Sequence, residues 1–326
     1  MRRTTWIAIS VILLLGGVTT ARAQSQVKVS GLFYMDYEYL IASPDSGAAG
    51  NNGFRYRRLY LTTDYTISDK FSGRARLEAQ TSRLSAGKPI AFVKDLWLRW
   101  KGALGEGHDL IFGVQSPPAF ATSEKLWGYR SLERTIMDRN AIVFSRDFGI
   151  QLKGKFGKDS PIGYAVMFGN NSVVIGETDK SKRVYGQLSW TPTKKITLTG
   201  GADYAAGPDR NAIETNAFAA YDAGVVRVGI EGYYRSADVK DADKKDTNLG
   251  VSVWAVAKAG DKFELVGRVD RVVRESVLDI PDETFALAGV AFVPDKNVRF
   301  IPNVWISEFT GSDPRVLGRL TIHANF

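Results

Sequence analysis

The chain has 326 residues, no cysteine, and 43 Lys and Arg against 35 Asp and Glu, a net charge of +8. The lack of cysteine excludes a disulfide framework and a thiolate metal site. The modest basic excess suits a surface or lumen that attracts anions, without demanding nucleic acid. This length indicates two domains in a soluble protein, but one closed sheet can use all of it. The 32 Gly, 13 Tyr and 17 Phe favour short strands and aromatic girdles.

The first 23 residues have the three parts of a secretory signal peptide. They begin with MRR, continue with the apolar run WIAISVILLLGGV, and end in ARA, which fits a small-x-small cleavage rule. The alternative is an uncleaved membrane anchor, but the run is shorter than the ~20 residues that a spanning helix needs. We therefore expect a signal peptide at 1–23 and a mature domain at 24–326, in which the basic excess falls to five.

Apolar and polar residues alternate strictly in many segments of the mature chain. In RVLGRLTIHANF, residues 315–326, the apolar residues share one parity with the final Phe326 and the polar residues take the other. KFSGRARLEAQ, DFGIQLKGKF and VVRVGIEGYYR repeat the pattern with charges on the polar face. Burying such charges in the water-free core of a β-sandwich would cost much free energy, whereas charges that face water carry no such cost. The pattern predicts an all-β protein, a transmembrane antiparallel β-barrel with apolar residues outward.

About sixteen strands can be recognised, each near the length of a tilted spanning strand. Fourteen or eighteen strands are alternatives, because three segments fit poorly. Pro302 lies inside a strand and suggests a bulge, Lys94 falls on an apolar parity, and 212–222 is weakly amphipathic. Short turns alternate with longer polar loops, as periplasmic and outer connections do in barrels. The predicted strands are 26–41, 54–67, 70–82, 90–101, 107–116, 147–156, 162–171, 182–192, 195–206, 212–222, 225–236, 247–258, 262–273, 283–293, 296–307 and 315–326.

The longest connection, residues 117–146, joins the fifth and sixth predicted strands and is basic. Thr122 or Ser123 can cap a short helix there, and Arg130, Arg134 and Asp138 follow at i, i+4 and i+8. The position is similar to that of the third outer loop of sixteen-stranded porins, which folds into the lumen. We therefore expect a long inward-folded third outer loop that forms a constriction.

Basic residues of this loop and of the strands are candidate anion-binding groups. Their charges can also be solvated or paired, as Arg134 with Asp138 or Arg146 with Asp147, and a wall Arg can equally form an ion pair across the interior. Within a barrel, low-dielectric walls focus the field, and the guanidinium fork suits phosphate or carboxylate. Strict alternation turns Arg57 towards lipid unless it lies at the rim or beside a bulge. The candidates from pattern alone are Arg58, Arg130 and Arg134, with Arg74, Arg76, Arg99 and Lys153 on the pore wall.

Four motifs carry a resemblance to a known family. They are FRYRRLYL at 54–61, FGVQSPPAF at 112–120, ATSEKLWGYRSLERTIMD at 121–138 and SRDFGIQLKGKF at 145–156. With the alternating strands they resemble the phosphate-selective porin O/P family over most of the mature chain. The resemblance implies that a paired Arg and the basic and hydroxyl groups of the loop line an anion site. By motif match these are Arg57, Arg58, Ser123, Lys125 and Arg134, and Glu124 stands where the family has a second hydroxyl.

The expected function is an outer-membrane porin, a water-filled channel for passive diffusion of small hydrophilic solutes that prefers anions, with phosphate the best single solute. The terminal Phe326 resembles the signal read by the barrel assembly machinery. Outer-membrane lipid, lipopolysaccharide and, by analogy, a homotrimer are expected partners. We expect no nucleic acid, no metal and no cofactor.

Three alternatives have different consequences. A barrel enzyme needs a nucleophile with a base, but the chain has two His and no GxSxG. A non-conducting structural or adhesive barrel predicts a plugged lumen and aromatic outer loops. A soluble periplasmic β-protein predicts that no detergent is needed.

Overall fold

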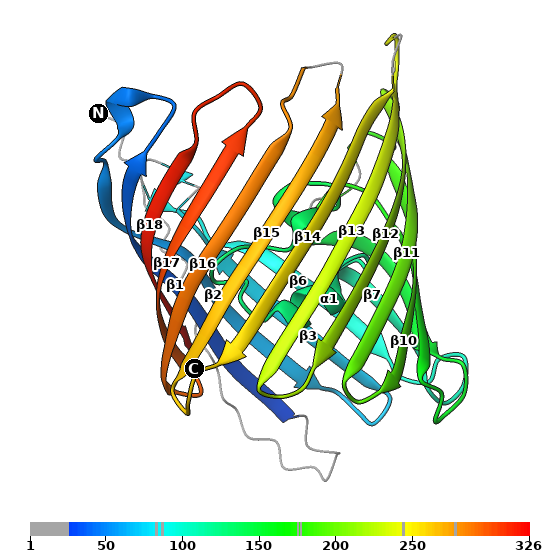
Figure 1. Cartoon of the computed structure of the whole chain (residues 1–326). Helices are drawn as coiled ribbons and strands as arrows, with labels where there is room; N and C mark the ends of the chain where they lie inside the picture. The colour runs from blue at the N-terminus through cyan, green and yellow to red at the C-terminus, as the bar shows by residue number, and fades with distance from the viewer. Residues whose placement is uncertain are drawn as a thin grey trace, which may run out of the picture.

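The computed structural model describes residues 26–81, 84–85, 88–174, 176, 178–242, 245–276 and 279–326, and within this part sixteen strands close into one antiparallel barrel (Figure 1). The predicted signal peptide lies outside the described residues. The barrel strands are β1 (Gln26–Ala42), β2 (Asn52–Thr66), β3 (Phe71–Ala79), β6 (Phe92–Trp100), β7 (His108–Gln115), β8 (Asp147–Lys155), β9 (Ile162–Gly169), β10 (Lys182–Thr193), β11 (Ile196–Ala206), β12 (Arg210–Asp222), β13 (Val226–Val239), β14 (Asp246–Lys258), β15 (Phe263–Glu275), β16 (Glu283–Asp295), β17 (Val298–Phe309) and β18 (Arg315–Asn325).

The remaining elements lie in the connections. A small hairpin, β4 (Leu84–Ser85) with β5 (Lys88–Pro89), follows β3, and a 3₁₀ turn, η1 (Ser46–Ala48), follows β1. Two short helices, α1 (Ala121–Trp127) and α2 (Ile136–Arg139), lie between β7 and β8. Within the described part of the chain, neither helix approaches the length and apolarity of a membrane span.

The barrel closes where the last strand meets the first. Strand β18 pairs with β1, and the backbones of Gly31 and Phe326 exchange two hydrogen bonds of 2.7 and 3.0 Å. The Phe326 ring lies over Gly31, where an added Cβ would come within 2.1 Å of the ring. The terminal aromatic is therefore seated on the first strand, and glycine provides the room for it.

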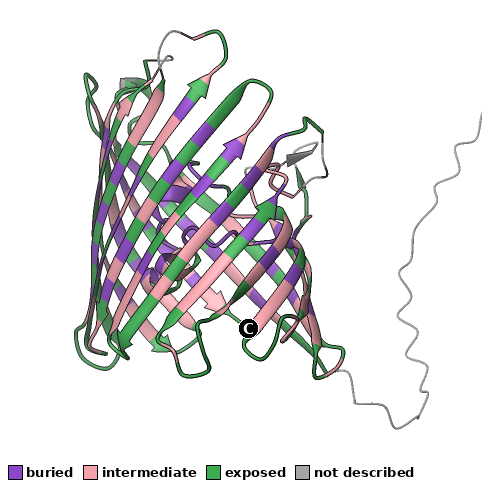
Figure 2. Cartoon of the chain, turned by 90° about the vertical axis from the view of Figure 1, so that its right-hand side faces the viewer, coloured by how far each residue is buried: buried purple, intermediate pink, exposed green. Residues whose placement is uncertain are grey.

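Each strand alternates between an exposed outer face and a more buried inner face, visible as bands of colour along the strands in Figure 2. On β14, for example, Leu249, Val251 and Val253 are exposed, whereas Ser252 and Trp254 are buried. The sixteen strands predicted from the period-2 pattern are confirmed, with ends that differ by a few residues, because alternation is set locally by the pleat.

Two β-bulges correct the predicted parity near the loop. On β2, Arg58 pairs with Tyr34 and Tyr56 pairs with Met35, so Arg57 is an extra residue. On β6, Asp95 pairs with Arg76 and Val93 with Leu77, which makes Lys94 extra. A bulge turns two successive side chains to the same face. This is why Lys94 broke the sequence pattern, and why Arg57 turns inward.

The bulge expected at Pro302 is not found. Strand β16 keeps the same register on both sides, with Gly289 opposite Asn303 and Phe292 opposite Phe300. Pro302 itself pairs with Leu320 of β18. Proline lacks an N–H, so it omits a ladder bond here without inserting a residue.

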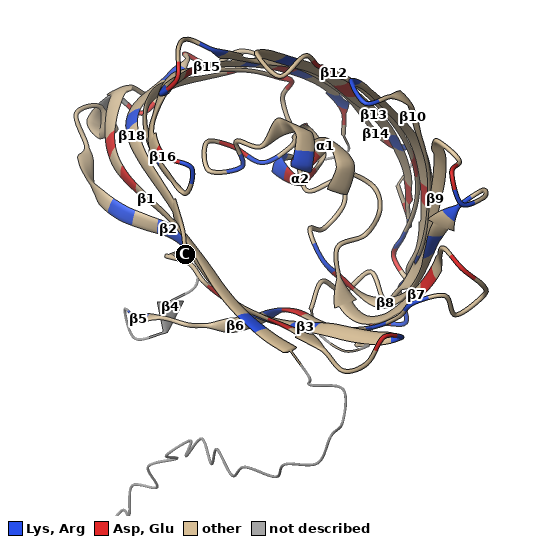
Figure 3. Cartoon of the chain, turned by 90° about the horizontal axis from the view of Figure 1, so that it is seen from below, with Lys and Arg blue, Asp and Glu red and all other residues tan. Residues whose placement is uncertain are grey.

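Residues 116–146, called the loop below, lie inside the ring of strands (Figure 3). The single capped helix expected there is wrong, because α1 has no side-chain cap and stops at Trp127. Gly128 follows in the left-handed conformation with φ 67°, and it reverses the chain before α2 begins. Arg130 and Arg134 therefore lie outside any helix, between α1 and α2.

The loop is packed against the inner wall by an apolar core. Trp127, Tyr129 and Leu132 are almost fully buried in a cluster with Trp254 and Phe285 of the wall. A second cluster joins the loop residues Phe120, Ile136, Met137 and Val143 to inward side chains of β9, β10, β13 and β15. The inner faces of β12 to β17 are partly apolar because the loop covers them. This also explains the weak amphipathicity of 212–222, where Phe218 faces inward onto the loop.

Candidate functional site

The wall opposite the packed side of the loop carries a group of cations. We call Arg57, Arg58, Arg76 and Lys94, from β2, β3 and β6, the basic wall. Each is mostly shielded, with side-chain exposures between 9 and 23%. The two bulges bring Arg57 and Lys94 to the same face as the other two. The wall therefore presents more cations than strict alternation allows.

Carboxylates interleave with the basic wall. Glu78 lies between Arg58, at 2.8 Å, and Lys94, at 3.0 Å. Asp95 lies between Arg76, at 3.1 Å, and Arg146 of the loop. The predicted pair of Arg146 with Asp147 is therefore wrong.

Asp147 is used differently. It accepts hydrogen bonds from the Tyr185 hydroxyl at 2.8 Å and from the backbone amides of Asn171 and Ser172. This carboxylate organises the start of the next connection, and it does not contribute to the charge balance beside the basic wall.

Arg57 joins the wall to the loop. Its guanidinium pairs with Asp36 and donates to the backbone carbonyls of Ser131 and Leu132. Asp36 also accepts a 2.6 Å hydrogen bond from the Thr321 hydroxyl. Most hydrogen-bond donors of Arg57 are therefore used by protein atoms. This corresponds to the alternative in which a wall arginine forms an ion pair across the interior and does not bind a solute anion.

Four other wall arginines hold the loop in the same way. Each donates to a backbone carbonyl of the loop, and Gln187 does so as well. The alternating pattern already places Arg227 on the inward, polar face. The other residues were not among the sequence-based candidates, although they share the same inward parity. The bonds are Arg183 to Ile142, Arg227 to Trp127, Arg268 to Arg134, Arg299 to Gly128 and Gln187 to Ala119. With the apolar clusters, they fix the loop at many points.

The charged residues of the loop differ in how far they are neutralised. Arg130 is 13% exposed and pairs with both Glu124 and Asp138. Arg134 is 41% exposed and makes only long contacts, 3.5 Å to Glu133 and 3.8 Å to Asp138. Glu124, which stands where the resembling family has a hydroxyl, therefore neutralises Arg130 and leaves Arg134 accessible.

Ser123 and Lys125 both lie in α1, but Ser123 is buried and Lys125 is exposed. Ser123 is buried and donates to the Phe120 carbonyl at 3.1 Å, as a helix-interior serine commonly does. Lys125 is exposed, and no described residue forms an ion pair with it. Of these two predicted loop positions, only Lys125 presents a free polar group to the lumen.

Burial and charge act in opposite directions on the loop carboxyls. Burial raises the pKa of Asp138, but the charges of Arg130 and Arg134 outweigh it and hold that pKa below 3.8. The pKa of Glu133 is likewise lowered against burial by Arg134 and Arg139. Both loop carboxylates therefore stay ionised at neutral pH and balance the arginines beside them.

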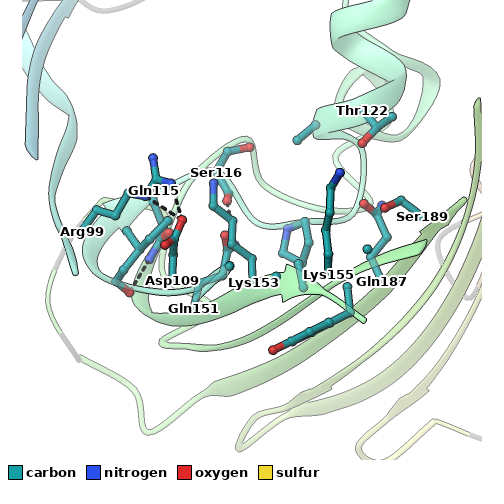
Figure 4. Close-up of a pocket in the computed structure, with 18 of the residues that line it drawn as sticks. Arg99, Asp109, Gln115, Ser116, Thr122, Gln151, Lys153, Lys155, Gln187 and Ser189 are labelled. Atoms are coloured by element: carbon teal, nitrogen blue, oxygen red, sulfur yellow. Dashed lines mark hydrogen bonds and ion pairs between the residues drawn. The ribbon is translucent and has the colours of Figure 1, made fainter. Parts of the chain in front are cut away.

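At the end of the barrel with the short turns, a cavity of about 820 Å³ lies between the start of the loop and β6 to β10 (Figure 4). We call it the vestibule. Arg99 donates to Asp109 at 2.8 Å on its edge, whereas Lys153 and Lys155 are exposed and form no ion pair with any described residue. Arg74, outside the vestibule lining, is held by Asp64 through two bonds of 2.7 and 3.0 Å. Of the four predicted wall residues, three are paired and Lys153 is not.

These features define a class of protein, a closed antiparallel β-barrel with a polar lumen that is narrowed by an internal loop. No protein-family model and no curated protein matches the sequence. Among solved structures, the chain is similar to the anion-selective porin from Comamonas acidovorans, with a TM-score of 0.70, 12% identity, and coverage of 93% of this chain and 100% of that one.

Two further solved structures have the same fold. The outer-membrane channel DcaP of Acinetobacter baumannii gives a TM-score of 0.66 and 10% identity, covering 96% of this chain and 99% of that one. A loop-deletion mutant of OmpT, an outer membrane protein of Vibrio cholerae, gives 0.66 and 15% identity, covering 93% and 99%. At these identities the likeness establishes the shared barrel.

Proposed function

We propose that the protein is a passive porin of the bacterial outer membrane, which passes small hydrophilic solutes and prefers anions. The closed barrel, its apolar outer face and the charged side chains that line its vestibule support a channel. One observation supports the preference for anions. Every carboxylate within the loop, and every one that contacts the basic wall, lies within ion-pair distance of a cation, whereas several cations that face the lumen have no such partner. Glu231 and Glu264 of the surrounding strands instead accept hydrogen bonds from the loop, from the Ile136 amide and the Tyr129 hydroxyl. The paired carboxylates are Asp36, Glu78, Asp95, Glu124, Glu133 and Asp138.

Among the cations left over are Lys125 on the loop and Lys153 and Lys155 in the vestibule, and Arg134 is only weakly paired. Their field acts in a narrow aqueous path with low-dielectric walls, where it raises the local concentration of anions. We propose that inorganic phosphate passes as one such anion. A dedicated phosphate site at Arg57 and Arg58 is less favoured, because both guanidiniums are engaged by carboxylates.

Assembly and surroundings remain part of the same proposal. The seating of Phe326 on the first strand supports its recognition by the barrel assembly machinery, and the exposed apolar belt supports contact with lipid and lipopolysaccharide. The OmpT structures include one described as a trimer form, and we propose a homotrimer here by analogy. No catalytic role is proposed, since the porins among the solved neighbours are channels and not enzymes.

Recording from purified protein in planar lipid bilayers tests this function. Under a KCl gradient, we expect open channels whose reversal potential corresponds to a preference for chloride over potassium. A cation-selective reversal potential would contradict the anion preference. Complete absence of channels from correctly folded protein would favour the alternative of a non-conducting structural or adhesive barrel.

A further inference from the structure

The vestibule contains a hollow in the barrel wall. On β8, Lys153 and Lys155 face inward and pair in register with Ala165 and Gly163 of β9. The same two residues pair on their other side with Gln187 and Ser189 of β10. Small side chains on the middle strand leave space between two rows of longer polar ones. Successive inward residues on a strand lie about 6.6–7 Å apart, so the two lysines flank the length of a small molecule.

The lysines keep their charge available because the nearest carboxylate is occupied. Asp109 is the cross-strand neighbour of Lys153. Its carboxylate instead accepts from the Arg99 guanidinium at 2.8 Å and from the Gly102 backbone amide at 3.2 Å. The other acid at the vestibule, Glu106, lies at the rim beside Lys158 and is 83% exposed. Figure 4 shows Lys155 extending from β8 towards the segment that carries Thr122.

Three glutamines add hydrogen-bond acceptors to this basic hollow. Gln115, Gln151 and Gln187 each direct the amide nitrogen to a backbone carbonyl, those of Ile111 at 3.1 Å, Ser116 at 3.4 Å and Ala119 at 3.0 Å. A carbonyl only accepts, so these contacts fix which end of each amide is the nitrogen. No described residue donates to the three remaining amide oxygens, and all three glutamines line the vestibule. These acceptors are available to a ligand that donates hydrogen bonds.

We propose that the vestibule binds hydroxylated organic anions, such as sugar phosphates or sugar acids. The anionic group is held by Lys153 and Lys155, and the hydroxyl groups donate to the glutamine oxygens. Inorganic phosphate at pH 7 carries its P–OH donors only on the charged group that the lysines hold, whereas a sugar phosphate carries further hydroxyl donors away from its charge. A neutral sugar satisfies the glutamines only. The volume of about 820 Å³ lies within the range of small-molecule pockets. This inference rests on the proposed channel function and specifies the solutes that dwell in the channel.

The test measures block of single-channel chloride current in planar bilayers at pH 7, with each solute added to both sides in turn. The solutes are glucose 6-phosphate, gluconate, inorganic phosphate and glucose. Glucose 6-phosphate is expected to halve the current at a concentration about three- to tenfold below that of inorganic phosphate, the contribution of one or two extra hydrogen bonds. Gluconate is expected to block more strongly than glucose.

Two variants and a control locate the effect. Lys153→Gln with Lys155→Gln removes the charges and is expected to weaken block by both phosphates at least tenfold. Gln187→Met removes one acceptor and is expected to reduce the advantage of glucose 6-phosphate over inorganic phosphate. Lys194→Gln, on an exposed short turn, is the matched control. Its channel is expected to be blocked by each solute at the same concentration as the wild-type channel. Heat-dependent gel mobility confirms that each variant has a folded barrel.

The outcomes separate this inference from the channel function. Equal block by inorganic phosphate and glucose 6-phosphate in the wild type would overturn the role of the glutamines. Unchanged block in the double lysine variant would overturn the site itself. Wild-type protein that forms no channels would instead contradict the proposed porin function.

Discussion

Arg130 and Arg134 show how two residues four positions apart in one loop take different roles. Arg130 is largely shielded between Glu124 and Asp138, and these two carboxylates neutralise its charge. Arg134 is half exposed, and its contacts are at the long limit of an ion pair. Exposed pairs contribute little to stability, whereas removal of one member of a buried pair leaves the other charge uncompensated.

Replacing these two arginines with alanine is therefore expected to have different effects. Arg134→Ala should change the free energy of unfolding by no more than about 0.5 kcal/mol and reduce anion selectivity. Arg130→Ala should cost about 3–5 kcal/mol, because it leaves two carboxylates without their main partner. Urea unfolding in detergent micelles and reversal potentials measure the two quantities. Equal losses of stability would contradict the assignment.

Acid titration provides a second prediction for the same residues. The pKa values of Asp138 and Glu133 are lowered in the folded loop, so their ion pairs stabilise it above pH about 4 and are lost as the pH falls through the lowered values. Protonation leaves Arg130 and Arg134 unbalanced, and anion selectivity should rise. Reversal potentials recorded from pH 6 to pH 3 test this. Asp138→Asn should already be more anion-selective at pH 7, and a shift towards cations in acid would refute the argument.

The loop behaves as an element of the core more than as a flexible connection. Its aromatic side chains pack on apolar residues of β12 to β17, and wall arginines donate to its carbonyls at several points. Without the loop, Phe218, Trp254 and Phe285 would face water inside the barrel. In the proposed channel, the path for solutes is therefore set by a fixed structure whose packing forms part of the stability of the barrel.

Truncation of Trp127 tests the structural role of the loop. Trp127→Ala removes a side chain that is 1% exposed and should lower the free energy of unfolding by about 3–5 kcal/mol. It should also increase open-channel current noise, because a loosened loop fluctuates in the lumen. Phe144→Ala is the control, since Phe144 is an aromatic residue of the same loop that is 40% exposed. If both variants were equally stable, the packing would contribute little.

At the scale of the whole molecule, the barrel depends on one seam between chain ends that are 295 residues apart in sequence, at Gly31 and Phe326. The seam is formed by the longest-range strand pair of the fold, β1 with β18. Forming such a contact carries the largest loop-closure entropy, so side chains at the seam are expected to influence assembly strongly.

Two substitutions at the seam should act through the same contact. Phe326→Ala is expected to lower the fraction of heat-modifiable, folded barrel on cold gels. Gly31→Val should do the same, because its side chain displaces the Phe326 ring. The double variant should assemble no worse than Phe326→Ala alone, since the clash disappears with the ring. Additive losses would show that the two residues act independently.

The sequence by itself determined the strands and their faces. Alternation with period 2 is a local property of the pleated backbone, so it identified sixteen strands, the outward apolar set and the position of the long loop. Two departures from the alternation also correspond to structural features. Lys94 lies at a bulge, and segment 212–222 packs against the loop.

Only the tertiary structure decided which cations remain available. Arg57, Arg76, Arg99 and Lys153 all face inward. The three arginines form ion pairs with carboxylates of other strands, and Lys153 does not. Those partners lie 10 to 21 residues away in sequence, and the loop contacts of Arg57 lie more than 70 away. Ion pairs form between side chains that strand register and barrel closure bring together. Alternation along one strand is a local pattern, so it cannot predict contacts between residues that are far apart in the sequence.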